Sequence, residues 1–152
     1  MSVTIGYYFN IDKPLHEFAD NLNAVLGCTL SPYEGDSTDF FCRFLAMEFS
    51  FGHNQLETDR NLNFNDYGYF LDVRVPSPDN DLLAIATDMM MSVAYVLHAR
   101  LDIHNGLLVW DVQVPIASYK LQGDEQDKER WYDTISQKFV TYPDHRLDVL
   151  RR

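Results

Sequence analysis

The order of apolar and polar residues divides the first half of the chain into strands and one helix. Residues 2–9 are rich in β-branched and aromatic side chains, which is typical of a strand. Residues 12–27 place apolar side chains at helical spacing and end at Gly27, so they predict an amphipathic helix. Three further segments have the pattern of strands, namely residues 28–33, 40–51 and 69–75.

The second half of the chain is dominated by one long apolar helix. Helical spacing over about residues 81–101 gives a wide apolar stripe that suits packing across a sheet, and the proline-containing stretch 76–81 precedes it. Met91 and His98 fall on the side of this helix opposite the stripe, where they are expected to face outward. A further strand is predicted over residues 107–114.

These elements follow one another in the order β-α-β-β-β-α-β. Strands that come in a run, instead of alternating strictly with helices, favour the α+β class over a doubly wound α/β fold. We expect a mixed or antiparallel sheet of about five strands with two helices packed on one face. Residues 1–152 are expected to form a single domain, with 116–152 as a peripheral C-terminal segment that contains a helix over 123–139.

The formal net charge of −11, from 23 acidic and 12 basic residues, limits the possible partners. Such a negative potential repels nucleic acids and anionic membranes, and it speeds encounter with basic proteins. We therefore expect no nucleic-acid partner and no membrane partner. The N-terminus has neither the basic start nor the apolar stretch of a signal peptide, so a cytoplasmic location is expected. Cys28 and Cys42 have apolar, strand-like surroundings, which favours reduced thiols.

Carboxylates on the polar sides of two predicted strands are the groups from which an active site could be built. In residues 107–114, alternation places Trp110 on the helix side and Asp111 on the opposite side. Asp72 lies on the polar side of its own strand. Together with His104, these acids form a candidate site for a small hydrolase or isomerase. The simpler interpretation is that Asp111 lies on the solvated side of the sheet.

The sequence lacks the usual signals of metal, cofactor and nucleotide sites. Its five histidines show neither the spacing of helical metal ligands nor a CxxC companion. It also has no glycine-rich phosphate loop and no GxSxG nucleophile motif. We therefore predict no metal, no cofactor and a non-enzymatic role.

Acidic residues alternate with aromatic ones in the predicted connections between the elements. Tyrosine and tryptophan supply contact area at low entropic cost, and carboxylates steer the protein toward a basic surface. We therefore predict that the protein, as a monomer or a homodimer, binds a basic protein partner. The candidate binding residues are Glu34, Asp36, Asp39, Asp59, Asp66, Tyr67, Asp124, Glu125 and Trp131.

An uncovered strand edge would indicate a different role. Such an edge presents a row of backbone donors and acceptors with which a second copy can pair. Under this hypothesis the chain is a structural or assembly subunit, and residues 69–75 are the candidate edge.

One segment resembles part of a known class of bacterial proteins. The stretch VAYVLHARLDIHNGLLVWDVQVP has the form A-x-x-L…G-h-h-h-x-D-x-Q. It resembles the helix-to-strand segment of small bacterial proteins of unassigned function and of immunity proteins from polymorphic-toxin and contact-dependent inhibition systems, over about residues 80–115. The resemblance implies a small acidic protein that neutralises a cognate toxin, often a basic nuclease, in the producer's cytoplasm. It implies no catalytic residues and no shared binding positions.

Overall fold

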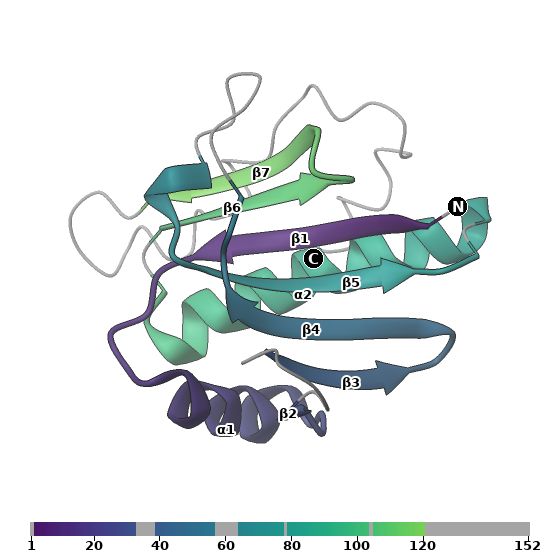
Figure 1. Cartoon of the computed structure of the whole chain (residues 1–152). Helices are drawn as coiled ribbons and strands as arrows, with labels where there is room; N and C mark the ends of the chain where they lie inside the picture. Colours follow the sequence, from purple (N-terminus) through teal and green to yellow (C-terminus); the bar gives the residue numbers. More distant parts are fainter. Residues whose placement is uncertain (1, 33–38, 57–63, 78, 104, 121–152) are drawn as a thin grey trace.

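The computed structural model describes residues 2–32, 39–56, 64–77, 79–103 and 105–120. A single sheet runs through this part of the chain, and Figure 1 shows its strands in the order β2-β3-β4-β5-β1-β6-β7. Every neighbouring pair is antiparallel. The elements are β1 (Val3–Phe9), α1 (Leu15–Leu26), β2 (Ser31–Pro32), β3 (Phe40–Phe44), β4 (Met47–His53), the short 3-10 helix η1 (Phe64–Asp66), β5 (Tyr69–Val75), α2 (Asn80–Leu101), β6 (Asn105–Trp110) and β7 (Val114–Lys120).

Both helices lie on the same face of the sheet. Figure 1 shows α2 running behind the central strands, with α1 next to it on the side of β3. Alternate residues of β1 point toward the helices, so Ile5, Tyr7 and Phe9 are buried in one core with Phe18 and Leu22 of α1. The protein therefore belongs to the α+β class, with two helices on one face of an antiparallel sheet, as predicted.

Gly27, the predicted stop of α1, and Asp79, which lies in the stretch 76–81 before α2, define two helix ends in the structure. Gly27 adopts a left-handed conformation with a φ of 66°, and its N–H donates to the carbonyl of Asn23 at 3.0 Å, which closes α1. At the start of α2, the carboxylate of Asp79 accepts a hydrogen bond from the N–H of Leu82 at 2.7 Å.

Two segments that were predicted as single strands contain tight turns instead. Residues 40–51 are β3 and β4, joined by a turn in which Leu45 has a φ of 55°. Residues 107–114 are β6 followed by a turn through Asp111 and Val112, whose φ angles are 50° and 59°. Neither turn contains the glycine or proline that normally marks a hairpin, so the sequence pattern did not reveal them. These turns raise the strand count above the five expected.

The strand proposed as a free edge is central in the sheet. β5 pairs with β4 on one side and with β1 on the other. The prediction of an uncovered edge at residues 69–75 is therefore wrong. Alternation along a sequence indicates the two faces of a strand, but it does not indicate which strands lie beside it.

The helix α2 is buried on more sides than an amphipathic surface helix. Met91 and His98, which were expected on its outer side, are both fully buried. The ring nitrogen Nδ1 of His98 lies 2.7 Å from the carbonyl oxygen of Ile103, just beyond the end of the helix. By length and composition α2 could cross a membrane, but a buried core helix has the same properties, and α2 packs against β1, β5, β6 and α1.

The chain continues past the predicted last strand into β7, which pairs with β6. Ile116 of β7 is fully buried. Residues 114–120 are therefore part of the sheet. The helix predicted over residues 123–139 lies outside the described residues.

The turn between β6 and β7 generates a stability prediction. Its N–H to C=O hydrogen bond joins Gln113 to Trp110 at 3.0 Å, and it forces the β-branched Val112 into the left-handed region. We expect Val112→Gly to raise the free energy of unfolding by about 1 kcal/mol, because relief of strain exceeds the added backbone entropy. Denaturant unfolding measures this change.

The neighbouring residue Gln113 supplies the control, since its φ is not positive. Gln113→Gly should lower the free energy of unfolding by about 0.5–1 kcal/mol, because glycine there only adds freedom to the unfolded chain. Equal losses of stability in both variants would show that Val112 is not strained.

Candidate functional site

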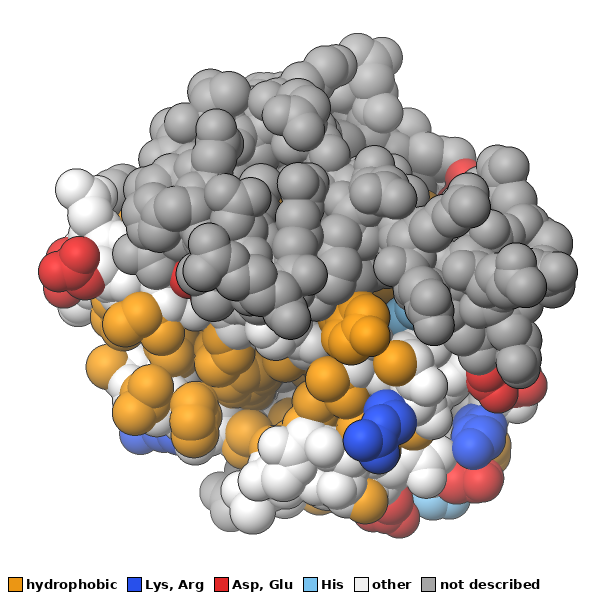
Figure 2. Space-filling view, turned by 180° about the vertical axis from the view of Figure 1, so that it is seen from behind, with side chains coloured by type: hydrophobic (Ala, Val, Ile, Leu, Met, Phe, Trp, Pro, Cys, Tyr) orange, Lys and Arg blue, Asp and Glu red, His pale blue; other side chains and the backbone are white. Residues whose placement is uncertain are grey.

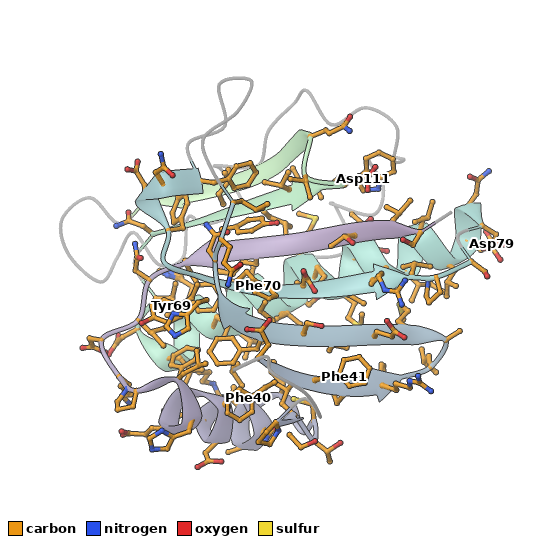
Figure 3. The ribbon with its side chains drawn as sticks, viewed as in Figure 1. Phe40, Phe41, Tyr69, Phe70, Asp79 and Asp111 are labelled. Atoms are coloured by element: carbon orange, nitrogen blue, oxygen red, sulfur yellow. The ribbon has the colours of Figure 1, made fainter. Side chains whose placement is uncertain are left out.

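The face of the sheet opposite the helices, here called the open face, carries the candidate site. Strand register places alternate side chains of β1, β3, β4, β5 and β6 on it. Figure 3 views the molecule from this side, with Phe41 and Phe70 drawn on the ribbon that faces the reader. The open face is made of Thr4, Gly6, Tyr8, Phe41, Arg43, Glu48, Ser50, Gly52, Phe70, Asp72, Arg74, Leu107 and Val109.

One end of the open face is covered by a second apolar cluster. Tyr8, Phe64, Leu107 and Val109 are buried there, with other aromatic side chains packed against them. The rings of Tyr8 and Phe64 meet edge to face, with centroids 4.9 Å apart. Because Phe64 belongs to η1, this contact holds the segment between β4 and β5 against the sheet.

Two asparagines fix the chain around η1. The side-chain amide of Asn54 donates to the carbonyls of Phe64 and Tyr67, at 3.0 and 2.8 Å. The side chain of Asn10 donates to the carbonyl of Asp66 at 2.7 Å and accepts from the N–H of Gly68 at 2.8 Å. These bonds hold Asp66 and Tyr67 at the end of the open face. Neither asparagine was predicted as a site residue, although asparagine is a common turn residue in such connections.

The other part of the open face is polar, and Asp72 lies at its centre. In the sheet, Asp72 is opposite Ser50 of β4 and opposite Gly6 of β1. The side chain of Tyr8 leans over Gly6, where an added Cβ would lie only 2.9 Å from the tyrosine hydroxyl oxygen. The Tyr8 hydroxyl group is thereby held beside Asp72.

A second carboxylate reaches Asp72 from the other side. The side chain of Asp39, just before β3, lies over Gly52, and an added Cβ at that glycine would collide with it. Gly52 is opposite Phe70, which is two residues from Asp72 on β5. The two glycines of β1 and β4 therefore leave room for polar groups to close in on Asp72 from both neighbouring strands.

Burial and a neighbouring negative charge destabilise the ionised form of Asp72. Burial, followed by the negative charge of Asp39, raises the pKa of Asp72 from 3.8 to about 7, although Arg74 lowers it. Burial and the charge of Asp72 likewise raise the pKa of Tyr8. Arg74 hydrogen-bonds to Glu48, with Nε 2.8 Å from the carboxylate, so part of its charge is already compensated. A cation brought to this place would favour the ionised form of Asp72.

A shallow, polar cavity of about 670 Å³ adjoins this carboxylate pair. It is lined by Ser31, Pro32, Phe41, Arg43, Glu48, Ser50 and Arg74. Among the described residues, no group of three or more His, Cys, Asp or Glu side chains is placed to hold a metal ion. The cavity carries two guanidinium groups and one carboxylate, so it suits polar groups, whereas the attraction for a cation lies at Asp39 and Asp72 beside it.

Three of the predicted binding residues lie within the described part of the chain, and all three adjoin the open face. Asp39 lies over Gly52, and Asp66 and Tyr67 belong to the segment that covers the apolar end. Phe70 connects them, because it packs against the cluster that includes Tyr67 and is opposite Gly52. The other six lie outside the described residues, namely Glu34, Asp36, Asp59, Asp124, Glu125 and Trp131.

The acids of the predicted enzyme site do not come together. Asp111 lies in the turn after β6, where its N–H donates to the carbonyl of Thr4 at 2.6 Å. The whole width of β1 separates β6 from β5, so Asp72 and Asp111 are about 10 Å apart across the strands alone. The carboxylate whose negative charge raises the pKa of Asp72 is that of Asp39. His104 lies outside the described residues.

The fold and this surface define an α+β protein with one helix-covered face and one open, partly acidic face. The chain matches no protein family, no curated protein and no solved structure.

The carboxylate pair predicts how Asp72 titrates. Removing the neighbouring charge with Asp39→Asn should lower the pKa of Asp72 below about 7, yet leave it above 3.8, because burial remains the largest cause. Carboxyl NMR shifts measured against pH report this value. Asp111→Asn is the control and should leave the pKa of Asp72 unchanged. A shift of equal size in both variants would contradict this geometry.

The raised pKa of Asp72 also predicts a pH dependence of stability. The folded state holds the Asp72 proton more tightly than the unfolded state does. The protonated carboxyl therefore contributes to the free energy of unfolding, fully below its ordinary pKa of 3.8, and this contribution is lost as pH rises through about 7. We expect Asp72→Asn to be more stable than the wild type at pH 8, by on the order of 2 kcal/mol after screening, and about equal at pH 4.

Denaturant unfolding at the two pH values tests this dependence. Asp20→Asn, at an exposed position of α1, is the control and should change stability equally at both. A difference between Asp72→Asn and the wild type that is the same at pH 4 and pH 8 would show that the carboxyl is not destabilised by folding.

Proposed function

We propose that this protein is a non-enzymatic binding protein of the immunity type, which neutralises a basic toxin in the cytoplasm through its open face. The observation that carries the proposal is the convergence of three separate chain segments on that face. Asp39 comes from the start of β3, Asp66 and Tyr67 from the segment after β4, and Asp72 from β5. The sequence resemblance to immunity proteins and the strong net negative charge support the same role.

The electrostatics of the open face favour a cationic partner. Asp39 and Asp72 repel each other, and burial adds to the cost of the Asp72 charge. A lysine or arginine side chain placed between the two acids would offset both their repulsion and the burial of the Asp72 charge. Arginine could in addition bind a carboxylate through two parallel hydrogen bonds. The same charges would take the place of substrate phosphates in the positive cleft of a nuclease.

The apolar end of the open face supplies contact area beside the charges. Tyr67 and Phe70 are half-buried and packed against a buried cluster, so they are held in place before any partner binds. Rigid aromatic side chains at the centre of an interface lose little entropy on binding. The open face thus combines fixed rings with carboxylates, as a stable interface with a basic protein requires.

Binding to the product of the gene next to the one that encodes this chain tests the proposal. After co-expression we expect a stable complex whose association rate falls as salt increases. Asp39→Lys and Asp66→Lys should each slow association several-fold, and Tyr67→Ala should mainly speed dissociation. Stopped-flow or surface-binding kinetics measure both rates.

The matched control reverses a charge on the helix-covered side. Asp20→Lys changes the net charge as much as Asp39→Lys does, but Asp20 is exposed on α1. It should therefore alter the association rate less than either open-face variant. Absence of a complex, or equal effects of the three lysine variants, would contradict binding through the open face.

A further inference from the structure

The helix-covered side of the sheet contains a mainly apolar cavity with two thiols in its wall. The cavity has a volume of about 350 Å³. It lies where the end of α1 meets the inner face of the sheet and the middle of α2, and its lining includes Leu26, Cys28, Cys42, Phe49, Leu71 and Met89. Figure 2 shows the molecule from this side, and many of the side chains on the described part of this surface are hydrophobic (orange). The cavity is partly open to solvent.

The two cysteines reach this cavity from different elements. Cys28 follows Gly27 at the end of α1 and is half-buried, and Cys42 lies on the inner face of β3 and is buried. Their thiol groups are within hydrogen-bonding reach of each other. The backbone of Thr29 also hydrogen-bonds to the Cys42 thiol. Neither cysteine is part of a disulfide.

The side chain of Asn23 fixes the segment that carries Cys28. The side chain of Asn23 binds both backbone groups of Leu30, accepting from its N–H at 2.7 Å and donating to its carbonyl at 2.9 Å. The same Asn23 oxygen accepts from the thiol of Cys28 at 3.3 Å. The connection after α1 is thereby fixed against α1 itself, and its continuation β2 pairs with β3, so the segments that carry Cys28 and Cys42 are held side by side.

We propose that Cys28 and Cys42 form a dithiol site that a small peroxide oxidises to an intramolecular disulfide. This inference is independent of the function proposed for the open face. The Cys28 thiolate attacks hydrogen peroxide, which gives a sulfenic acid and hydroxide. The Cys42 sulfur then attacks the Cys28 sulfur, and the sulfenic oxygen leaves as water. Overall, two thiols and one peroxide give one disulfide and two waters.

The structure also determines which sulfur reacts first and how the rate depends on pH. Cys28 is the more exposed of the two, so peroxide reaches it first, and Cys42 resolves the sulfenic acid. Burial raises the pKa of both thiols. The thiolate is the attacking species, so the reaction is slow at neutral pH and accelerates as pH rises toward the thiol pKa. The product covalently ties the segment after α1 to β3.

Peroxide treatment of the folded, full-length protein tests the proposal. The protein is exposed to hydrogen peroxide, unfolded in the presence of an alkylating reagent, digested and examined by mass spectrometry. We expect one cross-linked pair of peptides containing Cys28 and Cys42, an intact mass lower by two hydrogens, no alkylation of either residue and full reversal by a reductant. Thermal unfolding of the oxidised wild type should occur at a higher temperature than that of the reduced form.

Single-cysteine variants provide the matched controls. Cys28→Ser and Cys42→Ser should form no internal cross-link, and the temperature of unfolding of each should not rise after peroxide treatment. In Cys42→Ser the remaining Cys28 should stop at the sulfenic acid or oxidise further, since it has no resolving thiol. Wild-type thiols that both remain alkylatable, oxidise separately or link only between molecules would overturn the proposal, whether or not the variants fold.

Discussion

The packing of α2 across one face of the sheet is the interaction on which the rest of the structure depends. Met90 and Leu97 are fully buried in this contact, and burial of each such side chain contributes about 1.5–3 kcal/mol. Because α1 joins α2 on the same face, one side of the sheet becomes the core and the other is left open to polar groups. The position of every side chain on the open face follows from that division.

The open face is then shaped by residues that have little or no side chain. Gly6 and Gly52 let Tyr8 and Asp39 lie flat over the neighbouring strands, on either side of Asp72. A side chain at either glycine would push these groups away from the carboxyl. This arrangement destabilises the ionised form of Asp72, because the carboxylate is poorly solvated and lies next to a second negative charge. Strongly shifted pKa values of this kind are concentrated at functional sites. This links the packing of the sheet to the proposed binding of a cationic partner.

The sequence predicted the parts of the fold that depend on local periodicity. The bounds of α2 and the stop of α1 at Gly27 follow from patterns within a few residues, whereas α1 begins at Leu15 and not at residue 12. The turns at Leu45 and Val112 could not be predicted, because neither contains glycine and because Leu45 and Val112 themselves disfavour a left-handed backbone. Tertiary packing imposes those conformations and overrides local preference.

The candidate site was only partly visible in the sequence for a related reason. Acid and aromatic composition predicted Asp39, Asp66 and Tyr67 as binding residues, and strand alternation placed Asp72 on the polar side. Pairing Asp72 with Asp111 was wrong, because the order of strands in the sheet puts β1 between them. Which carboxylate lies next to Asp72 depends on the order of the strands and on the space left by Gly52 in β4. The periodicity of the sequence indicates neither of these.

The most direct measurement is the pKa of the Asp72 carboxyl, followed by NMR across a pH titration, in a complex of this protein with a basic protein that it binds. If a cationic side chain docks between the two acids, the value falls from about 7 toward the ordinary range of an aspartate. A value that stays near 7 in a complex that has demonstrably formed would mean that the partner binds elsewhere.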